Sequence, residues 1–159
     1  MIRTGIGFDS HRFDPARPLI IGGYTVPDAP GLAGHSDADV LSHALTDAIL
    51  GAVADGDIGS HFPDTDPQWQ GADSKQFLAH AITRLQTHGA TLVNVDATIM
   101  AEEPKMRPHI DAIRACLANT MAIHEDRVSV KATTLEKMGA LGRKEGIAVM
   151  AIATVEQLI

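Results

Sequence analysis

The sequence predicts one small α/β (α+β) domain, with a mixed β-sheet and helices on one face of that sheet. Its 159 residues fit a single domain spanning 1–159. Hydrophobic residues make up 45% of the chain and charged residues 21%, which is typical of a globular protein with a real core and excludes a disordered chain. Short apolar runs, which indicate strands, are interspersed with apolar residues at helical spacing, which indicate helices.

The expected elements follow one another without a linker, a repeat or a low-complexity segment. Ile2–Asp9 and the glycine-interrupted run Leu19–Val26 are expected to be strands. Ser36 stands where an N-cap would, with Asp39 three residues on, so a helix is expected over 36–55. The remaining expectations are a turn-rich stretch (56–71), helices (73–88 and 108–121), strands (91–100 and 128–134), a loop (135–145) and a final strand (146–155).

The final strand bears on assembly, because its two faces are both nearly apolar. Ile147 and Val149 face one way, while Met150 and Ile152 face the other. Both faces should therefore be buried. The three helices can cover one face, and we expect a homo-oligomer to cover the other. A strand inserted between two helical layers of the same chain is the alternative.

Charge and composition exclude several classes of partner. Thirteen Lys and Arg against 20 Asp and Glu give a net charge of −7, which disfavours nucleic-acid binding. No apolar run approaches the roughly 20 residues that a membrane helix needs, and no targeting leader is visible at the N-terminus. The single cysteine, Cys116, excludes an internal disulfide and fits a reducing compartment. A cytoplasmic protein is therefore expected.

One carboxylate and two imidazoles indicate a metal site. Strand alternation places Asp9 and His11 on the same side, and His43 on the expected helix is a candidate third ligand. Asp39, His43 and Asp47 share one helix face, and Asp47 could orient His43. A solvated polar face with a harmless histidine is the alternative.

Three further segments have polar residues suited to a phosphorylated substrate. The loop 56–66 is dense in Asp and Gly, which suits either turn formation or polyol recognition. The segment 101–108 is stiffened by two prolines and has Lys105 and Arg107 to meet phosphate or a base edge, unless it is an ordinary turn. The segment 131–137 combines hydroxyls, cations and Glu136, a set that can bind a Mg²⁺–diphosphate.

Taken together, these segments resemble the 2-C-methyl-D-erythritol 2,4-cyclodiphosphate synthases of the non-mevalonate isoprenoid pathway. The motifs run in family order from residue 5 to residue 149, which is almost the whole chain. They are GIGFDSHRF, GLAGHSDADVLSHALTDAILGA, GDIGSHFPDTDP, NVDATIMAEEPKM and VSVKATTLEKMGALGRKEGIA.

The resemblance implies a homotrimer whose sheets face a central apolar channel, with three active sites between neighbouring subunits. It implies Zn²⁺ on Asp9, His11 and His43, a second cation (Mg²⁺ or Mn²⁺) on Glu136, and transition-state stabilisation by His35 and Thr134. One subunit would surround the methylerythritol phosphate with Asp9, Ser10, His11, His35, Ser36, Asp57, Ile58, Gly59, Phe62, Pro63, Asp64, Thr65 and Asp66. Its neighbour would hold the cytidine diphosphate with Ala101, Glu102, Glu103, Pro104, Lys105, Met106, Arg107, Ala132, Thr133 and Thr134, and the following loop adds Leu135, Glu136, Ala140 and Arg143.

The implied reaction is an intramolecular phosphoryl transfer that closes a cyclic diphosphate and releases CMP. The loop with Ala140 and Leu141 departs from the family, which often has Phe and a hydroxyl there, so we expect this loop to pack differently against substrate. Arg143 matches a residue that faces a channel ligand in relatives, such as an isoprenoid diphosphate. A metal-dependent phosphohydrolase and a non-enzymatic binding trimer are the alternatives, and the match in the pyrimidine-binding loop favours the synthase.

Overall fold

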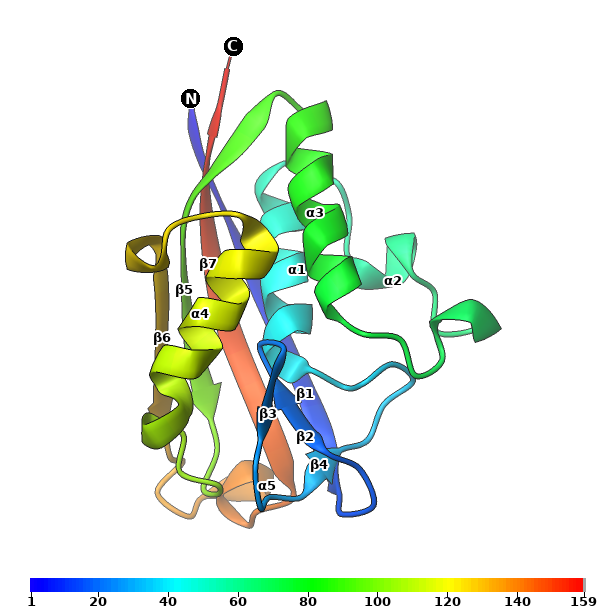
Figure 1. Ribbon diagram of the computed structural model, residues 1–159, viewed down its shortest axis with the longest axis vertical. Coiled ribbons are helices and arrows are strands. Elements are labelled where there is room, and N and C mark those ends of the chain that lie inside the picture. The colour runs from blue at the N-terminus through cyan, green and yellow to red at the C-terminus, as the bar shows by residue number, and fades with distance from the viewer. Residues whose placement is uncertain (159) are drawn as a thin grey trace.

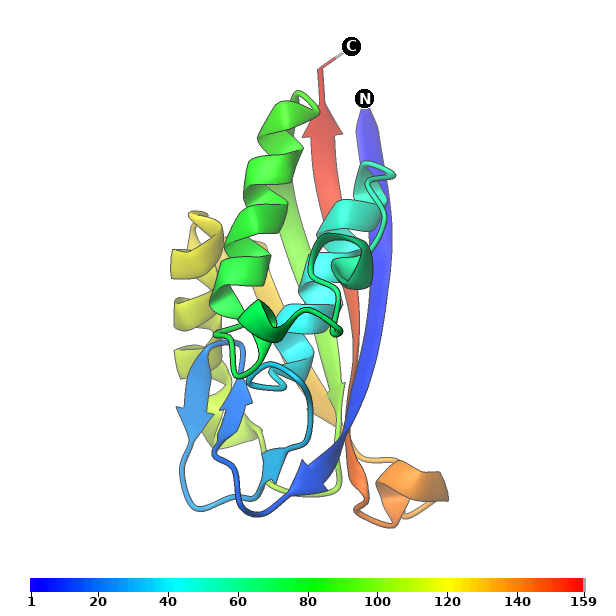
Figure 2. The ribbon, with the colours of Figure 1, turned by 90° about the vertical axis from the view of Figure 1, so that its right-hand side faces the viewer.

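The computed structural model describes residues 1–158, which form a five-stranded mixed sheet with helices packed on one face and a two-stranded ribbon beside them (Figures 1 and 2). The larger sheet has the order β4-β1-β7-β5-β6, in which β5 and β6 are parallel and the other neighbours are antiparallel. The strands are β1 (Ile2–Asp14), β2 (Leu19–Ile21), β3 (Tyr24–Val26), β4 (Gly31–Leu32), β5 (Ala90–Met100), β6 (Val128–Thr133) and β7 (Gly146–Gln157). The helices are α1 (Val40–Ala52), α2 (Ile58–His61), α3 (Lys75–Thr87), α4 (Ile110–Met121) and α5 (Gly139–Gly142), with short 3-10 helices η1 (Pro67–Trp69), η2 (Arg107–His109) and η3 (Glu125–Arg127).

The predicted fold class is confirmed, and most expected elements agree with the structure to within a few residues. Two strand predictions were wrong. β1 continues to Asp14, because it pairs with β7 as far as Arg12 opposite Gly146, so Asp9 and His11 lie inside the strand and not at its end. The run expected as one strand is the hairpin β2–β3, whose turn residues Gly22 and Gly23 have φ of +62° and +81°. Positive φ at both turn residues suits glycine and a tight hairpin.

The N-cap of α1 is Asp39 and not Ser36. The Asp39 side chain is fully buried and accepts four hydrogen bonds, two from the N–H groups of Gly22 and Gly23 (2.8 and 2.7 Å) and two from the N–H and hydroxyl of Ser42 (3.0 and 2.7 Å). It therefore caps the helix and fastens the β2–β3 hairpin to it. The expected N-cap, Ser36, lies before the helix, where its hydroxyl contacts His43.

Two glycines of β1 allow α1 to lie directly on the strand. A Cβ atom added to Gly7 would lie 1.9 Å from the carbonyl oxygen of Ala44, and one added to Gly5 would lie 2.0 Å from that of Ala48. The helix and strand backbones therefore touch without an intervening side chain. Around this contact, α1 buries an apolar face against β1, β7 and α3, including Leu41, Leu45 and Ile49.

Helices α1, α3 and α4 all lie on one face of the sheet, and within residues 1–158 the opposite face has only the short helix α5 at the lower end of the strands (Figure 2). Ile6 pairs with Ile152 and Phe8 with Met150 across β1 and β7, and their exposed fractions lie between 44% and 64%. A strand between two helical layers of one chain is therefore ruled out. Among the described helices, none combines the length and the apolar content that crossing a membrane requires.

Candidate active site

Asp9, His11 and His43 converge on one point between β1 and α1. Asp9 Oδ2 lies 2.8 Å from His11 Nε2 and 3.0 Å from His43 Nδ1, and the two imidazole nitrogens are 3.3 Å apart. Within residues 1–158, these three residues form the one group whose donor atoms are close enough to share a metal ion. Two ligands each about 2 Å from a tetrahedral zinc ion lie about 3.3 Å apart, so the spacing fits.

In each histidine, the ring nitrogen that faces away from Asp9 makes a hydrogen bond that orients the ring. His11 Nδ1 lies 2.7 Å from the carbonyl oxygen of Ala33, to which it donates. His43 Nε2 lies 2.8 Å from the hydroxyl of Ser74, which itself donates to Asp37. A carbonyl can only accept, and the Ser74 proton is already used, so both of these nitrogens carry the ring proton. In the neutral rings the nitrogens that face Asp9 are then free to bind a cation, as in catalytic zinc sites, whereas in the protonated rings they donate to Asp9.

The electrostatics of this cluster favour a carboxylate ligand. Burial alone raises the pKa of Asp9, but the hydrogen bonds and charges of His11 and His43 outweigh it and hold that pKa at about 2. Burial lowers the pKa of His11, and the hydrogen bond and charge of Asp9 more than compensate, so the net shift is upward. Asp9 therefore presents a negative charge at any physiological pH.

The cluster opens into a cavity of about 490 Å³. Its lining contains nine residues expected to surround the methylerythritol phosphate or the metal: His11, His35, Ser36, His43, Ile58, Gly59, Phe62, Pro63 and Asp64. Gly34, Trp69 and Phe77 complete it. The aromatic rings of Phe62, Trp69 and Phe77 pack against one another with centroids 4.5–5.8 Å apart, and they form an apolar wall opposite the polar groups.

The loop expected to recognise a polyol is more ordered than a turn-rich sequence suggests. Asp57 caps α2 by accepting from the N–H of Ser60 (2.8 Å), and Asp66 caps η1. The predicted contact of Asp47 with His43 was wrong, because the Asp47 carboxylate accepts from the N–H of Ile58 (2.7 Å) and so holds the start of α2.

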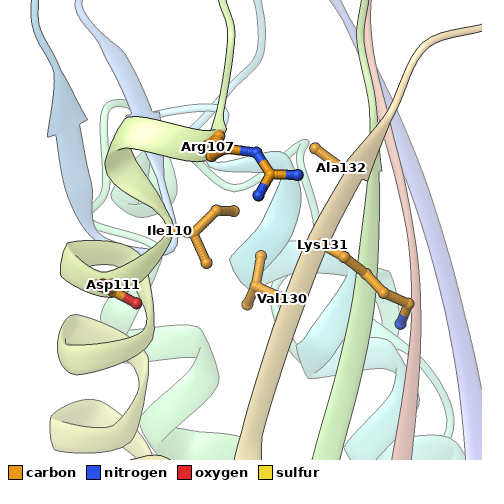
Figure 3. Close-up of a pocket in the computed structure, with 6 residues that line it drawn as sticks. All are labelled: Arg107, Ile110, Asp111, Val130, Lys131 and Ala132. Carbon is orange, nitrogen blue, oxygen red and sulfur yellow. The ribbon is translucent and has the colours of Figure 1, made fainter.

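The segment that the resemblance assigns to cytidine lies at the far ends of β5 and β6. A cavity of about 270 Å³ is lined there by Ala101, Glu102, Pro104, Lys105, Met106, Arg107, Ala132, Thr133 and Thr134. We call it the nucleotide cavity. Beside it is a second hollow of about 390 Å³ between α4 and β6, into which Arg107 reaches towards Ala132 (Figure 3). Arg107 lines both hollows, and Lys131 at the rim is paired with Asp96.

Strand β7 separates the nucleotide cavity from the metal cluster within one chain. It lies between β1 and β5 in the sheet, and β6 follows β5 (Figure 1). By the usual strand spacing, β1 is about 10 Å from β5 and about 14 Å from β6. Several expected site residues lie outside both cavities. Ser10 is on the bare face of the sheet, Glu103 pairs with Lys144, and Arg143 pairs with Glu145 beside Ala140 in α5. Thr65, Leu135 and Glu136 lie on the turns beside the cavities, and Glu136 is exposed.

Sequence reasoning missed Ser74, Asp37, Trp69 and Phe77. Ser74 is fully buried and orients His43, although it precedes an ordinary helix more than 30 residues away in sequence. Trp69 is the sole tryptophan of the chain, and its position beside the Asp-rich loop was the one signal that could have placed it.

The chain is similar to known proteins in sequence and in fold. The family model described as the YgbB family matches residues 2–156. The 2-C-methyl-D-erythritol 2,4-cyclodiphosphate synthases of Pasteurella multocida and Salinibacter ruber are 57% and 52% identical to this chain, each over 98% of it and over 98% and 99% of their own lengths.

Two solved structures are similar in fold and in sequence. The bifunctional IspDF of Campylobacter jejuni has a TM-score of 0.96 and 44% identity over 99% of this chain, and the match spans 43% of that longer protein. A 2C-methyl-D-erythritol-2,4-cyclodiphosphate synthase described as the CDP-bound form has a TM-score of 0.89 and 37% identity, covering 97% of this chain and all of that one.

Proposed function

The chain belongs to the YgbB family, and from this we propose that it cyclises 4-diphosphocytidyl-2-C-methyl-D-erythritol 2-phosphate to 2-C-methyl-D-erythritol 2,4-cyclodiphosphate in isoprenoid biosynthesis. CMP is the second product. The observation that carries this proposal is the Asp9–His11–His43 cluster opening into a substrate-sized cavity. Cys116, the single cysteine, fits the reducing cytoplasm in which we expect the enzyme to work.

The reaction needs no protein nucleophile and no water. An oxygen of the 2-phosphate forms a bond to the β-phosphorus, the bond from that phosphorus to the bridging oxygen breaks, and the electron pair leaves with CMP. We therefore classify the enzyme as a phosphorus–oxygen lyase. Because nucleophile and electrophile belong to one molecule, holding the substrate in a folded conformation supplies a large part of the rate enhancement.

Different residues of the chain would bind the two cations and the transferring phosphoryl group of the highly charged substrate. Asp9, His11 and His43 would hold Zn²⁺, and Glu136 would hold Mg²⁺ or Mn²⁺ together with diphosphate oxygens, as single carboxylates commonly do. When bound, the two cations offset the negative charge of the phosphates. His35 lines the cavity with its Nε2 directed to the carbonyl of Asp66 (3.1 Å), and we assign it and Thr134 to stabilising the transferring phosphoryl group.

The cytidine end would bind in the nucleotide cavity. Lys105 and Arg107 are exposed cations at its rim, and they suit the phosphates and the acceptor groups of the base. Prolines 104 and 108 stiffen the segment between them. The flat face of the base can pack against Met106 and Ala132.

We also propose that the active unit is a homotrimer, because neither half of the site is complete alone. The metal cluster of one subunit would face the nucleotide cavity of a neighbour, since in one chain β7 lies between the strand that holds Asp9 and His11 and the strands that end at the cavity. The bare face of the sheet, with Ile6, Phe8, Met150 and Ile152, would then line the centre. Isolated proteins rarely expose an apolar patch of this kind without a partner for it. An isoprenoid diphosphate along this face, near Arg143, is a further expectation.

The function is tested by incubating the purified protein with the cytidine diphosphate substrate, Zn²⁺ and Mg²⁺. Phosphorus NMR and mass spectrometry should detect CMP and a cyclic diphosphate, and EDTA should abolish both. His43→Ala should be inactive, while His124→Ala, an exposed histidine outside the two cavities, should react at the wild-type rate. Light scattering on the same samples should give the mass of three chains.

Other products would support different functions. An open-chain diphosphate beside CMP would show that water attacks, which is the phosphohydrolase. Absence of turnover by a zinc-loaded trimer would contradict catalysis and favour a binding protein. In that case Ala140 and Leu141, at which the chain departs from its family, would be exchanged first.

A further inference from the structure

The turn after β6 holds two non-glycine residues in the left-handed region of backbone space. Glu136 has a φ of +53° and Lys137 a φ of +62°. Residues other than glycine are strained in this region. Two of them in succession therefore need a contact from elsewhere in the chain to hold them there. The shape of this turn decides where the Glu136 carboxylate stands.

The carboxylate of Glu102 supplies that contact. Its Oε1 accepts hydrogen bonds from the N–H groups of Leu135 (2.8 Å) and Lys137 (3.2 Å). Between them, the N–H of Glu136 donates to the hydroxyl of Thr134 (3.3 Å). Backbone N–H groups that converge in this way form a concave site for an anion, and an ionised acceptor binds them more strongly than a neutral one.

Glu102 is well placed to link the two segments that line the nucleotide cavity. It directly follows Ala101, whose N–H donates to the carbonyl of Thr133 (3.0 Å) and so continues the pairing of β5 with β6. Glu102 is half-buried, whereas the neighbouring Glu103 is exposed and pairs with Lys144 (2.7 Å). Of these two acidic residues, Glu102 is thus the one committed to the turn.

We infer that Glu102 is a positioning residue that fixes the Glu136 turn against the nucleotide cavity, and not a substrate ligand as the resemblance implies. This role rests on the function proposed above, because its consequence is the affinity of the site for the second cation. Without the Glu102 carboxylate, the turn would relax out of the left-handed region and Glu136 would no longer be held beside the diphosphate.

The test compares Glu102→Ala and Glu102→Gln with the wild type, and uses Glu125→Ala, an exposed glutamate at the other end of β6, as a matched control. Two quantities are measured in the full-length protein: the Mg²⁺ concentration for half-maximal CMP release, and amide hydrogen exchange of Leu135 and Lys137 without substrate. We expect Glu102→Ala to raise the Mg²⁺ requirement by about tenfold and to accelerate both exchange rates, because charge-assisted hydrogen bonds are lost. The turnover number at saturating Mg²⁺ should change by less than about threefold.

The glutamine variant separates positioning from direct contact. Its side-chain oxygen can still accept from both N–H groups, so it should restore slow exchange and a Mg²⁺ requirement within about twofold of the wild type. A glutamine variant as impaired in Mg²⁺ use as the alanine variant, with exchange still slow, would make Glu102 a cation ligand and refute the positioning role. Unchanged exchange in Glu102→Ala, or altered exchange with an unchanged Mg²⁺ requirement, would refute it as well.

Failure of the proposed function gives a different result. A wild-type protein that releases no CMP would overturn the synthase and with it the link to Mg²⁺. Faster exchange in Glu102→Ala would then still establish that Glu102 holds the turn, and unchanged exchange would remove that contact too.

Discussion

Replacing Asp39 with alanine should destabilise the protein more than any surface substitution. The fully buried carboxylate accepts from Gly22, Gly23 and twice from Ser42. Each buried donor left without an acceptor costs about 1–3 kcal/mol. Two of the four donors can find another acceptor, because the Ser42 hydroxyl can rotate and the part-buried Gly23 N–H can reach water. That leaves the N–H groups of Gly22 and Ser42.

Leaving these two donors without an acceptor lowers the free energy of unfolding by roughly 2–6 kcal/mol. Burial raises the pKa of Asp39, which means that the buried charge is itself unfavourable. Removing the charge therefore recovers part of the lost stability. We therefore expect about 3 kcal/mol for Asp39→Ala, or a drop in Tm of about 6–12 °C for a domain of this size. Asp39→Asn retains one acceptor oxygen, so it should lose about half as much.

Urea unfolding at a fixed protein concentration, followed by circular dichroism, measures the effect. The concentration is held constant because assembly would also contribute to stability. A loss below about 1 kcal/mol for Asp39→Ala would refute the argument that this carboxylate joins α1 to the β2–β3 hairpin.

Three further predictions concern other charged groups. His43→Ala should lower the zinc content of the purified protein and abolish turnover while the mass in solution stays unchanged, and an unchanged zinc content would remove His43 from the site. Glu136→Gln should raise the Mg²⁺ concentration needed for activity, which a wild-type Mg²⁺ titration curve would contradict. The Arg84 hydrogen bond is the main reason why the pKa of Asp55 falls from 3.8 to about 2. Asp55 therefore stabilises the fold above pH 4 and loses this contribution as the pH falls towards 2. Asp55→Asn should be less stable than the wild type at pH 6, and urea unfolding at pH 2 should show a smaller gap.

Much of the fold followed from patterns within short stretches of sequence. Strand alternation and helical spacing are local properties, so β5, α3 and β6 lie where they were expected. The end of β1 did not follow, because its length is set by pairing with β7, which lies more than 100 residues away. The start of α1 was misplaced for a related reason, since Asp39, expected three residues inside a helix capped by Ser36, is itself the N-cap and is buried against the hairpin.

The metal cluster was predictable because its three ligands, one aspartate and two histidines, are residue types that bind metals and have suitable spacing. Its supporting groups were not, because Ser74 and the carbonyl of Ala33 carry no signal until the chain folds around His43 and His11. The resemblance grouped residues that line one cavity in the structure. It could not show that Glu102 turns its carboxylate to a neighbouring backbone, since that depends on the conformation of a turn.

The direct contact of α1 with β1 at Gly5 and Gly7 also has a consequence for how the site tolerates change. Asp9 and His11 lie on the strand and His43 lies on the helix, so their separation is set by two touching backbones and not by the size of a side chain between them. Exchanges among the apolar residues elsewhere in the core can then accumulate without altering the distance between the ligands. The protein can drift in sequence, or be engineered for stability, while the metal cluster keeps its dimensions.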